Sequence, residues 1–134
     1  MSQIHLPHNH NTDTNNMLEQ LPDSSDFQII PELFKQLSDI NRIKIFWLLC
    51  HCEECVINIS AMMEMSSPAV SHHLKNLKSA GLIVSRREGK EVYYKAADTK
   101  QVEIMHNMIE SLVDVTCPKT CFVKEHMKEN HCKH

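Results

Sequence analysis

The chain has only two glycines, Gly81 and Gly89, in 134 residues. Phosphate-binding loops, dinucleotide-binding motifs and nucleophile elbows each need several glycines at close spacing, so the sequence excludes them. Both glycines instead mark reversals of the chain. Gly81 follows a helical apolar pattern, and Gly89 separates two segments in which apolar residues alternate. The sequence therefore predicts a helix that stops at Gly81 and a two-stranded β-hairpin that turns near Gly89.

The helix before Gly81 also has a clear start signal. Ser66-Ser67-Pro68 combines a serine cap with a proline at the first helical position, and the apolar residues that follow repeat at the spacing of one buried face. These residues are Val70, Leu74 and Leu77. The predicted helix covers residues 68–80. Apolar periodicity predicts further helices over residues 31–37, 41–50, 56–63 and 99–115.

This order of elements predicts a mainly α fold with a small β-hairpin (α+β), the winged helix-turn-helix. We expect a flexible, histidine-containing arm over residues 1–25, a DNA-binding and dimerisation domain over 26–116, and a Cys/His-rich tail over 117–134. No stretch approaches the roughly 20 apolar residues of a membrane span, and no basic leader precedes an apolar run. We therefore expect a cytoplasmic protein with no membrane partner, in which the six cysteines are reduced.

The helix over 68–80 and the hairpin carry side chains suited to nucleic acid. Between residues 72 and 95 there are six Lys or Arg against two Glu, giving +4, whereas the whole chain is −3 and the remainder is therefore −7. Hydroxyl, imidazole, amine and amide groups can reach base edges or phosphates. The candidate DNA-binding residues are Ser66, Ser67, Pro68, Ser71, His72, Lys75, Asn76, Lys78, Arg86, Arg87 and Lys90. We expect His73, on the flank of the helix, to be packed or hydrogen-bonded.

Residues 66–83 and 86–94 closely resemble the recognition helix and wing of the ArsR/SmtB family of metal-responsive winged-helix repressors. The resemblance covers about residues 30–115. It implies a homodimer, paired through its first and last helices, that binds palindromic operator DNA. It also implies a repressor that leaves the DNA when an inducer binds.

One inducer site of this family lies on the last helix. Its four ligand positions align with Asp98, Lys100, Ser111 and Asp114. Two ligands are missing and Lys100 introduces a cation, so we expect no zinc site there. Glu103, His106 and Glu110 do share a face of the same helix, but a solvated polar stripe is the favoured interpretation.

The cysteines are the favoured inducer ligands. Cys55 occupies the first position of the family's cysteine box, whereas Ile57 replaces the second cysteine. Cys50, Cys52 and Cys55 could instead converge on one thiophilic ion, such as cadmium, lead, zinc or arsenite. The alternative for Cys50 alone is a buried core residue. Further along, Cys117 and Cys121 could complete this site or form a second one, within or across protomers.

Two other functions remain open. Closely spaced thiols could make the same fold a repressor that responds to oxidants or reactive sulfur, although the dithiol positions known in the family align with Trp47 and Val113. A small metal-buffering protein without DNA activity is the second, and the basic module argues against it. We expect no enzyme, because Cys50 and His51 lack a third orienting group, and no small organic substrate.

Overall fold

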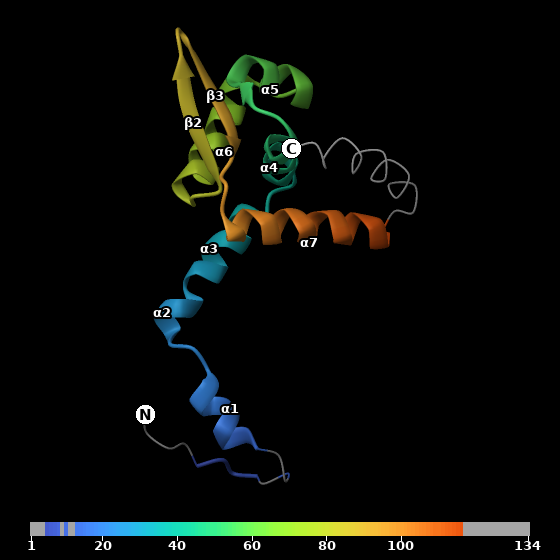
Figure 1. The fold of residues 1–134 in the computed structure, drawn as a ribbon. Coiled ribbons are helices and arrows are strands. Elements are labelled where there is room, and N and C mark those ends of the chain that lie inside the picture. The colour runs from blue at the N-terminus through green and yellow to red at the C-terminus, as the bar shows by residue number, and fades with distance from the viewer. Residues whose placement is uncertain (1–4, 9, 11–12, 117–134) are drawn as a thin grey trace.

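The computed structural model describes residues 5–8, 10 and 13–116. Three helices open this part of the chain and lead into the folded body (Figure 1). The elements in chain order are α1 (Thr14–Gln20), α2 (Ser24–Phe27), α3 (Ile29–Gln36), α4 (Ile40–His51), β1 (Glu54–Cys55), α5 (Val56–Met63), α6 (Ser67–Ser79), β2 (Ile83–Glu88), β3 (Glu91–Ala96) and α7 (Lys100–Thr116). This is the order of a winged helix-turn-helix, so the predicted fold class is confirmed.

Helix α6 begins and ends one residue before the predicted bounds of 68 and 80. Ser66 caps it, because its Oγ accepts a hydrogen bond from the backbone N–H of Ala69 at 3.3 Å, and Pro68 lies in the first turn. After the helix, Gly81 adopts a left-handed backbone with a φ of 77°. Gly89 does the same in the hairpin turn, with a φ of 63°. Glycine reaches this conformation without the steric cost that a Cβ imposes, so both predicted turns are confirmed.

The sheet has one strand more than the predicted hairpin. Strands β2 and β3 pair antiparallel as expected, but β1 pairs with the other edge of β3 and gives the order β1-β3-β2. The prediction of a two-stranded sheet is therefore wrong. A strand of two residues has no alternation that a sequence pattern could reveal. By pairing Glu54 with Tyr94, β1 fixes the chain that follows α4 against the wing.

The core lies where α4 and α5 pack on α6, with α7 packed on α4. Apolar side chains from all of these helices meet there, and the three predicted core residues of α6 are among them. The core residues are Ile45, Phe46, Leu49, Ile59, Val70, Leu74, Leu77, Leu82, Ile83, Ala97, Val102 and Met105. Burying each of the larger side chains contributes roughly 1.5–3 kcal/mol, so this cluster sets the position of α6.

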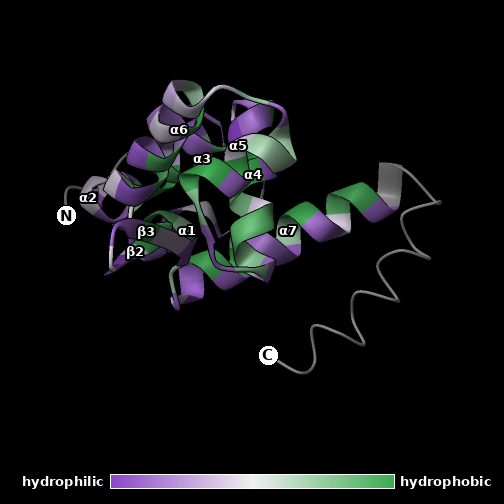
Figure 2. Ribbon diagram, turned by 90° about the horizontal axis from the view of Figure 1, so that it is seen from above, coloured by the Kyte–Doolittle hydropathy of each residue, from purple (hydrophilic) through white to green (hydrophobic). Residues whose placement is uncertain are grey.

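Helix α7 packs on the body only along its first half and then extends beyond it (Figure 2). Val102 and Met105 are buried, whereas Leu112 on the predicted apolar face is 57% exposed. Ile104 is 56% exposed. The protomer therefore covers only part of the apolar surface of this helix. The predicted stop at Pro118 and the tail over 117–134 lie outside the described residues.

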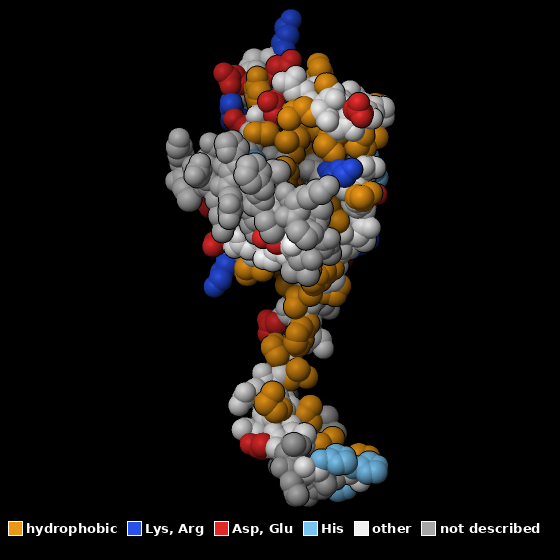
Figure 3. Space-filling view, turned by 90° about the vertical axis from the view of Figure 1, so that its right-hand side faces the viewer, with side chains coloured by type: hydrophobic (Ala, Val, Ile, Leu, Met, Phe, Trp, Pro, Cys, Tyr) orange, Lys and Arg blue, Asp and Glu red, His pale blue; other side chains and the backbone are white. Residues whose placement is uncertain are grey.

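The first helices form a stalk on the body (Figure 1). Hydrophobic side chains follow this stalk in the space-filling view (Figure 3). Phe27, Ile29, Ile30 and Phe34 are each more than 40% exposed, although Ile30 and Phe34 belong to the apolar stripe that the sequence predicts for this helix. Leu33 and Leu37 of this stripe pack against the core, so the described part of the protomer covers the stripe only in part. No helix among the described residues combines the length and apolar content that crossing a bilayer requires.

Candidate nucleic-acid interface and candidate metal ligands

The outer face of α6 carries the predicted DNA-binding side chains. Val70, Leu74 and Leu77 point into the core, which turns the opposite side of the helix to solvent. Seven of the eight candidates on and before this helix are exposed, and Asn76 is half-buried. The exposed ones are Ser66, Ser67, Pro68, Ser71, His72, Lys75 and Lys78. The fold therefore presents one continuous polar row from the cap of α6 to its last turn.

Several of these side chains hold one another in place. The imidazole Nε2 of His72 lies 3.3 Å from the amide Nδ2 of Asn76, one turn further along the helix. At the end of the helix the Lys78 ammonium donates a hydrogen bond of 2.7 Å to the Ser85 hydroxyl on β2. Lys78 therefore faces the base of the wing, whereas Lys75 extends from the middle of the row.

On the wing, Arg86 is held by acidic neighbours. Its guanidinium donates to the Glu53 carboxylate, with Nη2 at 2.7 Å and Nε at 3.0 Å, and also pairs with Glu88. It also lies 4.8 Å from the centre of the Tyr93 ring. The Arg86 guanidinium lowers the pKa of the Glu53 carboxyl, so this pair stays charged at neutral pH. A DNA phosphate would have to compete with Glu53 for Arg86, whereas Lys90 projects from the hairpin turn as an exposed amine.

His73 belongs to the scaffold, as predicted. It is 7% exposed, and its Nδ1 accepts a hydrogen bond of 3.2 Å from Nε of Arg42 on α4. Arg42 also donates to the side chain of Gln36 at 2.9 Å, and its backbone N–H is capped by Asp39 at 3.0 Å. Burial lowers the pKa of His73, which favours the neutral imidazole that this acceptor role requires. The start of α4 is thus tied to the middle of α6.

The three cysteines between the end of α4 and the start of α5 form no disulfide with one another and lie in different surroundings. Cys50 is half-buried, and burial together with the nearby Glu110 raises the pKa of its thiol to about 12. The Cys52 thiol donates to the Leu48 carbonyl at 3.4 Å, and its pKa is raised chiefly by burial. Cys55 is buried at the start of α5. The raised pKa values keep the Cys50 and Cys52 thiols protonated at neutral pH without an ion.

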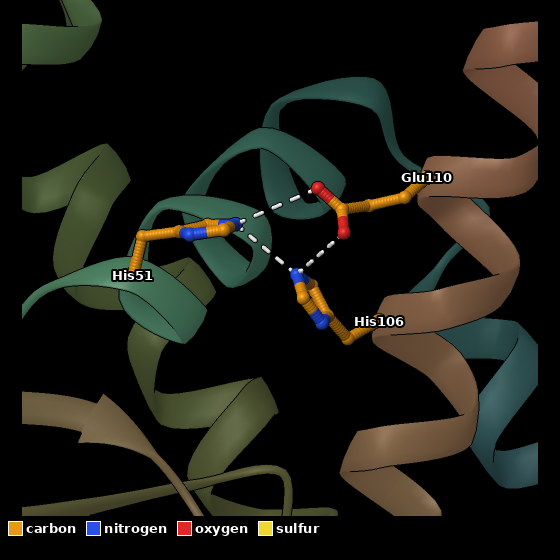
Figure 4. A group of neighbouring side chains, drawn as sticks. All are labelled: His51, His106 and Glu110. Atoms are coloured by element: carbon orange, nitrogen blue, oxygen red, sulfur yellow. Dashed lines mark hydrogen bonds and ion pairs between the residues drawn. The ribbon is translucent and has the colours of Figure 1, made fainter. Parts of the chain in front are cut away.

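The structure gathers a different set of ligand atoms. Among the described residues, the group whose possible ligand atoms all lie within 4.8 Å of one another is His51, His106 and Glu110 (Figure 4). His51 comes from the last turn of α4, and the other two lie one turn apart on α7. Cys50, Cys52 and Cys55 do not form such a group, so their joint ligation stays a prediction. Cys117 and Cys121 lie outside the described residues.

The predicted solvated polar stripe on α7 is wrong for two of its three residues, His106 and Glu110. The third is Glu103. His106 is 7% exposed and the Glu110 side chain 15%, because α7 turns both against the end of α4. Only Glu103 is exposed. Sequence reasoning missed His51 because it lies 55 residues from His106. The available signal was a His and a Glu spaced four apart on one helix, together with a histidine at the end of another helix.

Comparison with known proteins covers the same segment. Residues 39–85, from the cap of α4 into β2, match the family described as bacterial regulatory protein, arsR family. The chain is 35% identical over 85 residues to a transcriptional repressor SmtB homolog from Synechocystis sp., covering 63% of this chain and 64% of that protein. It is 42% identical over 73 residues to the cadmium resistance transcriptional regulatory protein CadC from Listeria innocua, covering 54% and 61%. The chain thus spans less than two thirds of the length of these relatives.

Solved structures agree with the architecture. A homodimeric winged helix-turn-helix DNA-binding domain from Mycobacterium bovis, a possible ArsR-family regulator, matches with a TM-score of 0.60 and 26% sequence identity. The match covers 80% of this chain and 91% of that one. The architecture is therefore that of this winged helix-turn-helix DNA-binding domain.

Proposed function

We propose, from the match of residues 39–85 to the arsR family of bacterial regulatory proteins, that the chain is a metal-responsive transcriptional repressor. In this proposal it binds operator DNA as a homodimer and releases it when a thiophilic metal or metalloid ion binds. The observation that carries the proposal is the polar row on α6, which is capped, exposed along its length and followed directly by a basic wing.

We assign base recognition to the middle of α6. Ser71, His72, Lys75 and Asn76 bear the donors and acceptors that read base edges when a helix lies in a major groove. Ser66 and Ser67, at the N-terminus of the helix, suit a phosphate, because backbone N–H groups and the helix dipole favour an anion there. Arg87 and Lys90 on the wing would contact phosphates beside the groove, and Arg86 would join them only by leaving Glu53.

We assign dimerisation to the apolar surfaces that the protomer leaves exposed. Ile30 and Phe34 on α3, and Ile104 and Leu112 on α7, would be buried if two copies paired through these helices. A two-fold pair of this kind presents two α6 helices to successive major grooves, about 34 Å apart, and therefore reads a palindrome. The M. bovis domain described above is itself a homodimer.

The proposed inducers follow from the relatives and from the cysteines. One of the relatives above is a cadmium resistance regulator, and another is a homolog of the repressor SmtB. Cadmium, lead, zinc and arsenite all accept thiolate ligands, and Cys50, Cys52 and Cys55 are the candidate donors, with Cys117 and Cys121 as possible additions. Binding must deprotonate these thiols and bring their sulfur atoms together, so the ion would reshape the segment between α4 and α5.

The test is fluorescence anisotropy of the reduced, metal-free chain on DNA from upstream of its own coding sequence. We expect tight binding that is lost on titration with one of cadmium, lead, zinc or arsenite. If DNA affinity is unchanged by every ion but falls after oxidation, the protein is a thiol-based redox sensor instead. No binding to this DNA or to other palindromic fragments, with ions still bound, would favour a metal-buffering protein.

A further inference from the structure

The side chains of His51, His106 and Glu110 converge on one point between α4 and α7 (Figure 4). The Nε2 atoms of the two imidazoles are 3.1 Å apart, and the Glu110 carboxylate oxygens lie 3.3 Å from His106 Nε2 and 3.8 Å from His51 Nε2. We propose that these three residues bind one divalent transition-metal ion, of the zinc, cobalt or nickel class, at a site separate from the cysteines. The proposal rests on the proposed repressor function for its regulatory role, but not for the binding itself.

The separations are close to those at a metal ion. Zinc binds imidazole nitrogen at about 2.0–2.1 Å and carboxylate oxygen at about 2.0–2.2 Å, so two ligand atoms at a tetrahedral zinc ion lie about 3.3–3.5 Å apart. The two imidazole nitrogens are 3.1 Å apart, and one ligand atom from each of the three residues lies within 4.8 Å of the others, the two separations to Glu110 ending on different oxygens. A rotation of the Glu110 carboxyl group with small side-chain shifts would therefore complete three corners of a tetrahedron. Two imidazoles and one carboxylate are also a ligand set that borderline ions favour.

Hydrogen bonding alone satisfies this arrangement poorly. A neutral imidazole offers one N–H, and Nε2 of His106 has both His51 Nε2 and a Glu110 oxygen within 3.3 Å. A single proton on that atom cannot point at both neighbours. A cation at the centre would instead accept lone pairs from all three atoms at once. The geometry is thus better matched to one shared ion than to a chain of donors and acceptors.

An ion could reach the site from solvent and would be shielded once there. The side chains of His51 and Glu110 are each 15% exposed, and that of His106 is 9% exposed. Beside them lies a pocket whose wall includes Cys50, His106, Asp98 and Glu103. Lys100 lies on the same wall, so two carboxylates face one ammonium and the wall keeps a net negative charge beside His106. The site therefore has an entry path and a partly dehydrated interior, which strengthens ligation.

The position of the site gives it a route to the DNA-binding face. His51 ends α4, and the next residues include Glu53, which holds Arg86 on the wing, and Cys55, which pairs with β3. At the other end of α4, Arg42 holds His73 of α6. An ion that clamps α4 to α7 would therefore couple the proposed dimer helix to both the wing and the recognition helix. The site would then be a second place at which a metal ion regulates DNA affinity, and it would respond to ions that prefer nitrogen and oxygen ligands.

The test is zinc and cobalt binding to the full, reduced chain by calorimetry, with visible absorption of bound cobalt as a second readout. His106→Gln and Glu110→Gln each remove one ligand with little change in volume. Glu91→Gln is the matched control, since it makes the same change at the exposed start of β3, outside this pocket. Cys52→Ser separates the thiol site. We expect the two ligand variants to lose one equivalent per protomer, or to bind it at least about 100-fold more weakly, whereas Glu91→Gln binds it like the wild type and Cys52→Ser loses only an equivalent bound through thiols.

The outcomes separate this proposal from the repressor proposal. Equal stoichiometry and affinity in wild type, His106→Gln and Glu110→Gln would overturn the site, whatever the ion does to the DNA complex. Loss of the equivalent in both variants, with a native circular dichroism spectrum, would support it. If His106→Gln does not fold, Glu110→Gln and His51→Gln decide the matter. If zinc does not change the DNA affinity of the wild type, but the ligand variants still lose one equivalent of bound metal, the metal site stands and its regulatory role is overturned.

Discussion

Arg42 on α4 donates a hydrogen bond to Nδ1 of His73 on α6, with 3.2 Å between the two nitrogen atoms. The acceptor must be unprotonated, so this link exists only while His73 is neutral. Asp39, 3.9 Å from the other ring nitrogen, adds an attraction for the protonated ring, but burial dominates and lowers the pKa. The position of the recognition helix is thus tied to the protonation of one buried imidazole.

The first prediction is that His73 makes the fold sensitive to mild acid. In the unfolded chain this imidazole binds a proton near pH 6.5, whereas in the fold its pKa is lower. The unfolded state therefore binds more protons below about pH 6.5, and the free energy of unfolding falls as the pH falls through that window. Asp39 stays ionised there, because the Arg42 backbone N–H lowers the pKa of its carboxyl.

Thermal unfolding at pH 7.5 and pH 5.5 checks this. His73→Gln keeps a hydrogen-bond acceptor for Arg42 but cannot titrate. We expect the wild type to lose roughly 2–4 °C more in Tm between the two pH values than the variant does. A His8→Gln variant controls for the loss of a histidine, since His8 is exposed. Identical pH dependence in wild type and His73→Gln would contradict the assignment.

The second prediction concerns the polar row on α6. Lys75 is exposed in the middle of this row, so Lys75→Ala should weaken operator binding by roughly 10-fold with little change in stability. Lys44→Ala removes an exposed lysine from α4 and serves as the matched control. Fluorescence anisotropy on metal-free protein measures both. If the two variants bind equally well, Lys75 does not face the DNA.

Most of the fold could be predicted because its signals are local. The cap at Ser66, the stop at Gly81 and the apolar repeat of α6 all act within one helix, and the structure reproduces them. Strand β1 could not be predicted in the same way, since Glu54 and Cys55 become a strand only by pairing with Tyr93 and Tyr94, about 40 residues later. Their conformation depends on a tertiary contact rather than on their own sequence pattern.

The candidate metal ligands show the same limit more strongly. The cysteines drew attention because three of them lie within six residues, yet closeness along the chain did not bring their sulfur atoms together. His51 and His106 are far apart along the chain, and the packing of α7 on α4 places their rings 4.9 Å apart. Which polar residues of an amphipathic helix are buried depends on a neighbouring helix end, and that neighbour is not visible in the helix's own pattern.

The third prediction is that Glu53 restrains DNA affinity. Its carboxylate accepts hydrogen bonds from the Arg86 guanidinium. Glu53→Gln removes the negative charge from this pair, so the Arg86 side chain should become available to a DNA phosphate. We expect operator affinity at low salt to rise roughly threefold to tenfold, with a steeper salt dependence because each protomer gains a phosphate contact. Glu103→Gln removes the same charge from the exposed side of α7 and should have a much smaller effect. Equal gains in both variants would mean that net charge alone, and not the release of Arg86, is responsible.

The fourth prediction concerns the apolar stripe on α3. Phe34 is 55% exposed in the protomer, and a two-fold dimer through α3 and α7 would bring two copies of it to the same interface. Phe34→Glu would then introduce two carboxylates into an apolar contact and raise the dimer dissociation constant by at least about tenfold. Ile57→Glu, at a 66% exposed position on α5, is the control that leaves this surface intact. Sedimentation velocity across a concentration series distinguishes the two variants.

The same variant should also alter DNA binding. A dimer contacts both half-sites of a palindrome at once, whereas a single half-site contacts only one protomer, so Phe34→Glu should weaken binding to a full palindrome more than to a single half-site. A dimer that survives Phe34→Glu unchanged would show that the protomers pair through another surface.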